Sequence, residues 1–341
     1  MDVYGDLCHD TLAKKIKPKK SYSAGQDYAA YKRDVKKDLY DFLCLDNIKE
    51  NACEPAFQIE SEEKKDGYTI IRFSFYSEVD AKVPCYLLIP DTGKKKYPLC
   101  ITLQGHSTGF HNSIGVPIYE NDEEYIKRGA FALQAVEKGF AALALEQRGL
   151  GERKSANGFD WRGCDYQSSR AKMMGRTILG ERVWDVQRAM DIVAEKFPVC
   201  DMEKIALMGS SGGGTATYYV ACMDERVKLA AASCAFCTFK HSILSVYHCP
   251  CNYVPNMILS YEMQDFSCLI APRNFLVLAG VEDNIFPFEG VQEAYATTQT
   301  FYEIEGVKDK CRLVPMPKGH YFCKEIVWDA IEEEAKKLGW L

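Results

Sequence analysis

The sequence predicts an α/β protein whose central sheet has about eight mostly parallel strands, with helices on both faces. Short apolar runs, such as residues 97–105 and 274–280, are typical of parallel strands that are buried on both sides. Between such runs, residues 180–197 repeat apolar side chains at spacings of three and four, as an amphipathic helix does. Strands that alternate with helices indicate a parallel sheet covered by its crossover helices.

The elements follow one another in a clear order. Runs at 68–77 and 82–90, the first alternating in places, predict an antiparallel pair at the edge of the sheet. Later apolar runs predict the other strands, and helical spacings predict the segments between them. These strands are expected at 97–105, 139–149, 204–209, 227–235, 274–280 and 310–317, and helices at 180–197, 213–223, 288–302 and 325–339.

The chain divides into an arm and a main domain. Residues 1–66 combine a lysine-rich run with helical apolar spacing, so we expect an N-terminal helical arm packed on the main domain, residues 67–341. Residues 236–270 hold aromatic residues and prolines between two strands, and we expect a lid-like insertion there. Residues 105–138 and 150–180 also interrupt the alternation. Long segments at such points usually provide substrate contacts.

Composition and charge exclude several classes of protein. Of the 341 residues, 47% are hydrophobic and 26% charged, which excludes a disordered or fibrous chain. The net charge of −6 argues against a nucleic-acid partner, which needs a basic surface. No apolar run reaches the roughly 18–20 residues of a membrane span, and the acidic start does not fit a signal peptide. We therefore expect a cytoplasmic protein with no membrane partner, whose 15 cysteines are reduced and buried.

A turn rich in glycine and serine is the first candidate for chemistry. Residues 209–213, Gly-Ser-Ser-Gly-Gly, match G-x-S-x-G between an apolar run and a helical pattern. A nucleophile on a sharp strand-to-helix turn needs small residues two positions away on either side, because the backbone leaves no room there. The pattern predicts Ser211 as the nucleophile. A phosphate-binding loop is disfavoured, because no Gly-Lys-Ser/Thr follows and the glycine spacing does not fit a dinucleotide site.

A serine nucleophile needs a base, and the base needs an acidic partner that orients it. In this kind of turn the chain order is serine, acid, histidine. His320 follows the last predicted strand and Asp283 follows the strand at 274–280, so both are expected at the sheet edge that holds Ser211. Glu282 is the adjacent competitor of Asp283. The sequence thus predicts a triad of Ser211, His320 and Asp283.

The negative charge that develops on a carbonyl oxygen needs hydrogen-bond donors. We expect two backbone N–H groups to form this oxyanion hole: that of Gly212, directly after the nucleophile, and that of His106, in the loop after the third strand. His111, Trp161 and Tyr247 are candidates for the pocket wall. For these three, a loop or core position without substrate contact is the alternative.

These motifs, taken together and in order, resemble an α/β-hydrolase. The stretches "QGHSTG", "LEQRGLGER", "GSSGGG", "GVEDNIFP" and "KGHYF" are similar to the bacterial acetyl xylan esterase-like and dienelactone hydrolase-like group, over residues 68–341. The resemblance implies the α/β-hydrolase fold and ester hydrolysis through an acyl-serine, with the triad and oxyanion residues named above and without a cofactor. The chain departs from that group at "RGL" and "GSSGG", where related deacetylases have RGQ and GxSQG, and at Ser211, where dienelactone hydrolases have cysteine. The resemblance therefore does not fix the acyl specificity.

Two further groups of residues have alternative roles. Arg148 suits a carboxylate of a substrate, whereas an ion pair with Glu152 would make it structural. His241, His248, Cys249 and Cys251 are of zinc-ligand type, but their spacing does not fit a standard zinc site, so we predict no metal. The alternative for this segment is an apolar lid wall.

The residues together predict a serine carboxylesterase that acts on a small-molecule ester. A small acyl group on a polar or sugar-like alcohol is implied by the resemblance alone. The same triad would also serve a peptidase, a thioesterase or an acyltransferase, because these differ in pocket shape and water access. The alternatives from other classes are a catalytically silent hydrolase fold that binds a ligand and a zinc-dependent hydrolase centred on residues 241–251. Whether the arm forms a homo-oligomer stays open.

Overall fold

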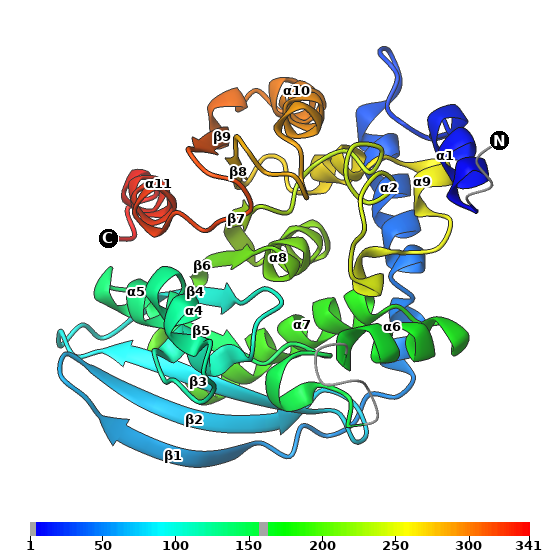
Figure 1. Ribbon diagram of the computed structural model, residues 1–341. Coiled ribbons are helices and arrows are strands. Elements are labelled where there is room, and N and C mark those ends of the chain that lie inside the picture. The colour runs from blue at the N-terminus through cyan, green and yellow to red at the C-terminus, as the bar shows by residue number, and fades with distance from the viewer. Residues whose placement is uncertain (1–4, 157–162) are drawn as a thin grey trace.

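The computed structural model describes residues 5–156 and 163–341. Its centre is one nine-stranded sheet in the order β1-β2-β3-β5-β4-β6-β7-β8-β9 (Figure 1). The strands β4 to β9 are parallel, whereas β1, β2 and β3 are joined antiparallel at one edge and β3 is antiparallel to β5. The strands are β1 (Gln58–Lys64), β2 (Tyr68–Tyr76), β3 (Lys82–Pro90), β4 (Tyr97–Leu103), β5 (Ala141–Leu145), β6 (Cys200–Ser210), β7 (Val227–Ser233), β8 (Asn274–Gly280) and β9 (Cys311–Met316).

The predicted α/β class and mostly parallel sheet are confirmed, with nine strands where about eight were expected. Helices cover both faces, with α5 and α11 on one side of the sheet and α7, α8 and α10 on the other (Figure 1). The helices are α1 (Asp6–Lys15), α2 (Tyr28–Phe42), α3 (Leu45–Lys49), α4 (Asp122–Arg128), α5 (Phe131–Glu137), α6 (Gly163–Met173), α7 (Ile178–Lys196), α8 (Gly212–Met223), α9 (Met257–Ser260), α10 (Phe288–Ile304) and α11 (Lys324–Lys337).

Each face of the sheet has its own hydrophobic layer. Along β4, Leu99 and Ile101 point into the layer beneath α7 and α8, while Cys100 points into the layer beneath α5 and α11. This alternation is the period-two pattern of a strand, and both sets are buried because helices cover both faces. The strands therefore form a rigid platform whose carboxyl ends meet at one edge.

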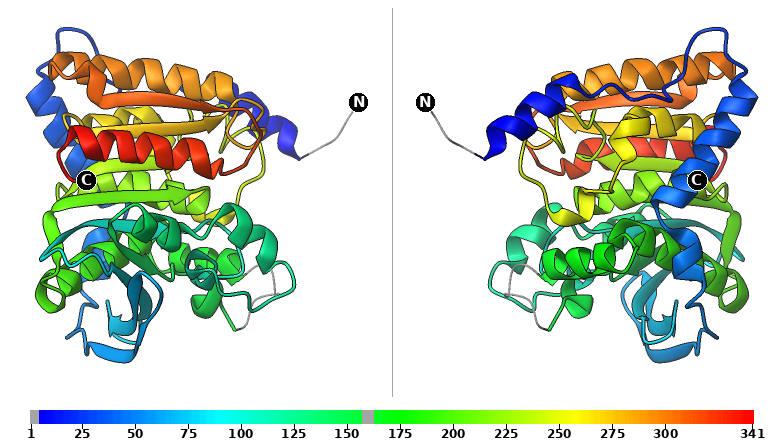
Figure 2. Two further views of the ribbon diagram at one scale, coloured as in Figure 1. Left: turned by 90° about the vertical axis from the view of Figure 1, so that its left-hand side faces the viewer. Right: turned by 90° about the vertical axis from the view of Figure 1, so that its right-hand side faces the viewer.

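The N-terminal segment adds a further layer outside α7 and α8. Asp27 caps α2 by accepting the N–H of Ala30 at 3.1 Å, and the buried face of α2 packs into the core layer beneath it. Figure 2 (right) shows α2 along the outer surface of this layer. The structure differs from the predicted arm, residues 1–66, at its end, because residues 58–64 form strand β1. Every residue of β1 is exposed, so it lacks the apolar pattern that marks a strand.

The predicted lid-like insertion, residues 236–270, connects β7 to β8. Its second half contains η4 (Met263–Leu269), a 3-10 helix that is buried in the core layer against α2 and α10. Its first half contains η3 (Pro250–Asn252) and reaches the carboxyl edge of the sheet, where the Thr215 hydroxyl donates to Asn252 Oδ1 at 3.3 Å. Only the first half is therefore placed to influence the site.

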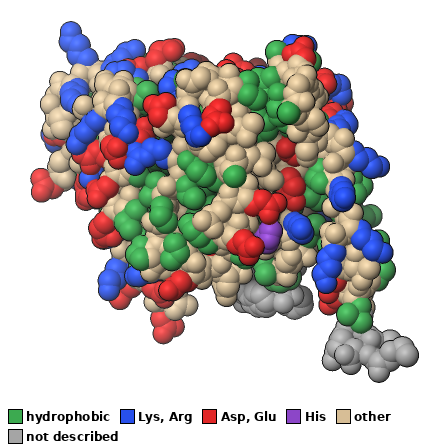
Figure 3. All heavy atoms as spheres, turned by 90° about the horizontal axis from the view of Figure 1, so that it is seen from above, with side chains coloured by type: hydrophobic (Ala, Val, Ile, Leu, Met, Phe, Trp, Pro, Cys, Tyr) green, Lys and Arg blue, Asp and Glu red, His purple; other side chains and the backbone are tan. Residues whose placement is uncertain are grey.

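The described residues also show the character of the helices, the surface charge and the burial of the cysteines. None of the helices in residues 5–156 and 163–341 has both the length and the apolar character that a bilayer crossing requires. On the face that Figure 3 shows, acidic and basic side chains lie interspersed with apolar ones. Most of the cysteines are buried among core side chains.

Candidate active site

Ser211 lies at the sharp turn between β6 and α8. Its φ of +55° and ψ of −123° fall in a region that residues other than glycine avoid. The turn is tightly packed: a Cβ added at Gly209 would lie 2.4 Å from the Gly213 carbonyl oxygen, and one added at Gly213 would lie 2.0 Å from the Leu103 carbonyl oxygen. Glycine is therefore required at both positions, and the turn projects the serine hydroxyl above the sheet edge.

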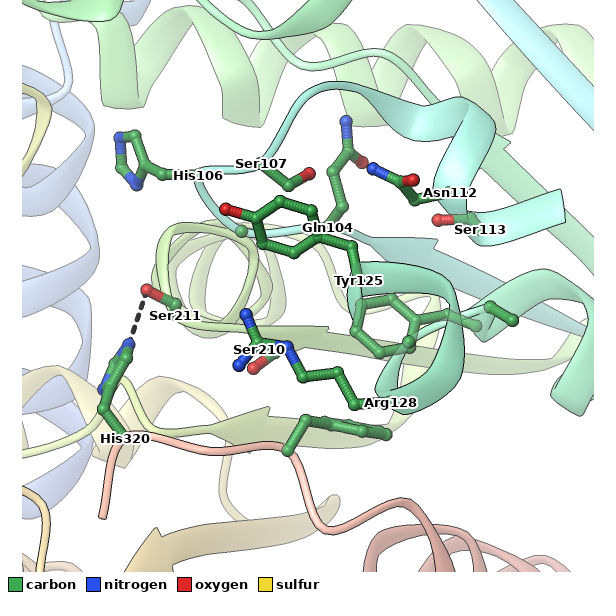
Figure 4. A pocket seen from close by; sticks show the side chains of 15 residues that line it. Gln104, His106, Ser107, Asn112, Ser113, Tyr125, Arg128, Ser210, Ser211 and His320 are labelled. Atoms are coloured by element: carbon green, nitrogen blue, oxygen red, sulfur yellow. Dashed lines mark hydrogen bonds between the residues drawn. The ribbon is translucent and has the colours of Figure 1, made fainter. Parts of the chain in front are cut away.

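The structure brings Ser211, His320 and Asp283 together, as Figure 4 shows for the first two. The Ser211 hydroxyl lies 2.9 Å from His320 Nε2, and His320 Nδ1 lies 2.9 Å from Asp283 Oδ2. The other oxygen, Asp283 Oδ1, accepts the backbone N–H groups of Ile285 (2.8 Å) and Phe286 (3.0 Å). An imidazole that donates from Nδ1 to the carboxylate leaves Nε2 free to accept the serine proton.

Asp283 has the electrostatic environment of an ionised carboxylate. Burial alone would raise its pKa, but the hydrogen bond and charge of His320, together with the N–H groups of Phe286 and Ile285, outweigh burial and lower the pKa. The neighbouring Glu282, which the sequence offered as the competitor, is exposed. The geometry therefore favours Asp283 as the partner of His320.

The predicted oxyanion donors lie beside Ser211. The loop after β4 comes so close that a Cβ added at Gly105 would lie 3.0 Å from Ser211 Cβ, and one added at Gly212 would lie 2.8 Å from His106 Nδ1. In the described part of the chain, neither the His106 N–H nor the Gly212 N–H bonds to another backbone oxygen. The Gly212 N–H also belongs to the first turn of α8, where the helix dipole favours negative charge.

The loop after β4 is held from beneath by Glu146, which is fully buried at the end of β5. Its carboxyl accepts the N–H groups of Phe110 (3.1 Å) and Glu152 (3.2 Å) and the side-chain amide of Gln104 (2.5 Å). Burial raises the pKa of Glu146 to about 7, although the two backbone hydrogen bonds act in the opposite direction. Glu146 lies in the stretch "LEQRG", but the sequence did not predict that it supports this loop.

A pocket with a cavity volume of about 120 Å³ opens beside Ser211 and His320 (Figure 4). Arg128 lies in its wall, with its guanidinium over the rings of Tyr125 (5.1 Å to the centroid) and Tyr321 (5.5 Å), and in Figure 4 its side chain extends toward Ser211. Arg128 and Tyr125 belong to α4, within the segment 105–138 that the sequence marked for substrate contacts without naming these residues. A single arginine on a short helix does not by itself indicate a pocket residue, so the sequence gave no signal for Arg128.

The structure places His111, a predicted wall residue, outside the lining of this pocket. It is buried behind the pocket, where its Nε2 lies 2.9 Å from Asp122 Oδ2, and it does not line the pocket. Tyr247, another predicted wall residue, is 76% exposed and also lies outside this lining. Trp161 lies outside the described residues.

Arg148 is structural, but not through the predicted partner Glu152. Its guanidinium bonds to Asp185 (2.9 Å) and forms ion pairs with Glu78 and Glu181, whereas Glu152 pairs with Arg72 at 2.8 Å. Arg148 does not line the pocket beside Ser211. These contacts favour the structural alternative over a role in binding a substrate carboxylate.

Comparison with known sequences agrees with this architecture. The Abhydrolase family model matches residues 3–237, which is more than half of the chain and includes the turn at Ser211. The chain belongs to the Abhydrolase family. The predicted α/β-hydrolase fold is thereby confirmed. The family match ends before Asp283 and His320, so the placement of these two residues rests on the structure.

Individual relatives of this Abhydrolase family member extend over most of its length. YtaP of Bacillus subtilis strain 168, provisionally named a hydrolase, is 26% identical over 260 residues, 73% of this chain and 82% of YtaP. A Bacteroides fragilis NCTC 9343 structure, provisionally named an acetyl xylan esterase, has a TM-score of 0.80 at 14% identity and covers 98% of this chain and 96% of its own. The structure of a glucuronoyl esterase from Solibacter usitatus has a TM-score of 0.64 at 16% identity. The match covers 88% of this chain and 92% of the esterase. At these identities, the two structural likenesses show a shared fold.

Exchanging the acidic partner of His320 tests the triad. We expect Asp283→Asn to slow the reaction of Ser211 with a fluorophosphonate by on the order of 10⁴-fold, because an amide does not hold the imidazole in the required tautomer. Glu282→Gln is the matched control and should react at the wild-type rate. Loss of labelling in Glu282→Gln but not in Asp283→Asn would reverse the assignment.

The raised pKa of Glu146 predicts a pH-dependent stability. Because the folded-state pKa of about 7 exceeds the ordinary value of 4.5, the folded state holds the proton more tightly, and the free energy of unfolding falls as pH rises from about 4.5 to 7. In Glu146→Gln this fall is absent. Urea denaturation at pH 5 and pH 8 should show the variant gaining roughly 3 kcal/mol relative to wild type between these pH values. An equal pH dependence of the two proteins would contradict the protonation of Glu146.

Proposed function

We propose that this protein is a serine carboxylesterase that hydrolyses a small-molecule ester through an acyl-serine intermediate. The observation that supports this most directly is the chain of hydrogen bonds from the Ser211 hydroxyl through His320 to Asp283, at 2.9 Å each. The fold shared with proteins named as acetyl xylan and glucuronoyl esterases, and the relative named as a hydrolase, point in the same direction.

In the first half of the proposed reaction, Ser211 Oγ attacks the carbonyl carbon of the ester while His320 Nε2 takes the hydroxyl proton. The N–H groups of Gly212 and His106 hold the oxygen of the tetrahedral intermediate, and Asp283 stabilises the imidazolium. The bond from carbon to the alcohol oxygen then breaks, and His320 gives its proton to that oxygen.

The second half repeats these steps with water. His320 takes a proton from a water molecule, whose oxygen attacks the acyl carbon, and the same donors hold the second oxyanion. Collapse of this intermediate breaks the bond to Ser211 Oγ, which recovers its proton from His320. The acid is released, and the enzyme returns to its starting state without any cofactor taking part in these steps.

The pocket favours a polar substrate of modest size. Phe131 and Phe322 provide apolar surface near the triad, whereas Asn112, Ser113 and Arg128 provide polar groups in the same wall. A pocket that combines apolar contact with a few placed polar groups fixes the orientation of a small ligand. We infer a small acyl group on a polar, sugar-like alcohol, with Arg128 placed to bind a negatively charged or carbonyl group of the substrate.

Aryl esters test the activity and its nucleophile. Wild type should hydrolyse p-nitrophenyl acetate faster than the octanoate, and Ser211→Ala should lose at least about 10³-fold in kcat/KM. Ser210→Ala is the matched control within the same motif. It should stay within about tenfold of wild type, because Ser210 lines the pocket whereas His320 Nε2 bonds to the Ser211 hydroxyl. Undiminished turnover in Ser211→Ala would exclude the acyl-serine route.

The charge of Arg128 predicts substrate preference. We expect Arg128→Ala to lose roughly 10- to 100-fold in kcat/KM for esters whose alcohol carries a carboxylate, the loss of one charge-assisted hydrogen bond. Esters whose alcohol carries a neutral amide in place of the carboxylate should lose much less in kcat/KM. Lys127→Ala, an exposed change one residue earlier on α4, is the control. Equal losses on both substrates would mean that Arg128 only shapes the wall.

A further inference from the structure

Four side chains of metal-ligand type meet beside the oxyanion loop. The ligand atoms of His106, Cys164, Cys249 and Cys251 all lie within 4.8 Å of one another. Cys249 Sγ is 3.3 Å from Cys164 Sγ, and Cys251 Sγ is 3.5 Å from His106 Nε2. The ligands come from three separate segments: the loop after β4, the start of α6, and the insertion between β7 and β8.

This arrangement fits a tetrahedral zinc ion. Zinc lies about 2.3 Å from cysteine sulfur and about 2.0–2.1 Å from histidine nitrogen, which places tetrahedral ligand atoms roughly 3.5–3.8 Å apart. The separations of 3.3 and 3.5 Å lie just below this range and at its lower edge, and no two of the ligand atoms are more than 4.8 Å apart, so small side-chain rotations suffice. Three cysteines and one histidine form a closed ligand set, which is typical of a structural site and leaves no open position for a reacting water.

A buried cation next to the cluster indicates that it is negatively charged. The Arg182 side chain is only 1% exposed, and its Nη2 donates to Cys164 Sγ at 3.2 Å. Its Nε and Nη2 also donate to the Arg148 carbonyl oxygen, and Cys251 is a further partner of the guanidinium. Among the described residues no carboxylate forms an ion pair with Arg182. A buried guanidinium needs a negative partner. Three thiolates around Zn²⁺ have a net charge of −1, which Arg182 would balance.

We propose that His106, Cys164, Cys249 and Cys251 bind one zinc ion. Binding displaces a proton from each of the three thiols to solvent, while the imidazole coordinates through its neutral Nε2. This ligand set differs from the one considered for residues 241–251. The histidines of that segment are engaged elsewhere: His248 Nε2 bonds to the Ser242 hydroxyl at 2.9 Å, and His241 Nδ1 bonds to the Thr238 hydroxyl at 2.7 Å.

The ion would join the insertion and α6 to the loop that supplies the oxyanion donor. His106 provides a ligand through its ring and an oxyanion donor through its backbone N–H, so fixing the ring restrains the N–H. This consequence rests on the proposed esterase function, whereas zinc binding does not. His106 is in this respect a positioning residue, and loss of the ion should lower kcat more than it raises KM.

Metal analysis of the purified full chain tests the proposal. We expect about one zinc per chain in wild type and almost none in Cys249→Ser and Cys251→Ser. Cys53→Ser, a partly buried cysteine outside the cluster, is the matched control and should retain zinc. Ser211→Ala should also retain it, so zinc in that variant supports the metal site even where no ester is hydrolysed.

A second measurement does not depend on the folding of the cysteine variants. Wild type stripped with a chelator and loaded with Co²⁺ should show the intense visible absorption of tetrahedral cobalt with thiolate ligands, and its kcat should fall by roughly tenfold or more while it is metal-free. Wild type that contains no zinc and binds no Co²⁺, or a Cys164–Cys249 disulfide found by mass spectrometry in the freshly purified protein, would overturn the proposal.

Discussion

The close contact between Gly213 and the carbonyl oxygen of Leu103 is the constraint on which the site depends. It presses the first turn of α8 against the end of β4, and no side chain fits between them. Two consequences follow. Ser211 is held in its strained conformation, and the loop that begins at Gln104 starts directly over the N-terminus of α8. This backbone contact thus brings the proposed nucleophile and the start of the proposed oxyanion loop together.

The parallel sheet explains how distant residues reach this contact. The strands β4, β5, β6, β8 and β9 all end at the same edge, and each delivers one polar group directly after it. These are His106, Glu146, Ser211, Asp283 and His320. The strands are joined by continuous pairing, so the distances between these side chains depend on the short turns that follow the strands, and long loops are left to shape the pocket.

The turn and the strands were predictable because their signals are local. The glycines of the serine turn and the apolar runs before Ser211, Asp283 and His320 are required by steric fit and burial, which act within a few residues. Contacts between loops that are distant in the chain leave no local pattern of this kind in the sequence. His111 and Arg148 have the same chemistry as pocket residues, but the structure places them against Asp122 and against a buried acidic cluster.

The same reasoning explains why the cysteine cluster was not predicted from the sequence. Spacing along residues 241–251 did not fit a zinc site, because Cys164 and His106 lie far away in the chain and only the fold brings them to Cys249 and Cys251. Strand β1 was not predicted for a different reason, because an exposed edge strand needs no apolar residues. Patterns of burial therefore predict elements, while clusters assembled from several loops need coordinates.

For the proposed oxyanion hydrogen bond, the loop after β4 has to be rigid although it lies at the surface, where few apolar contacts are available. Here it is fixed from below by Glu146, which accepts hydrogen bonds from Gln104 and Phe110, and from above by the ring of His106 in the cysteine cluster. Polar anchors of this kind are directional and define an orientation that hydrophobic packing would leave free. The buried Glu146 carboxyl is held out of water, which carries a free-energy cost that a purely structural loop would not need to bear. That cost is explicable if the orientation of one backbone N–H, at His106, decides how well the site works.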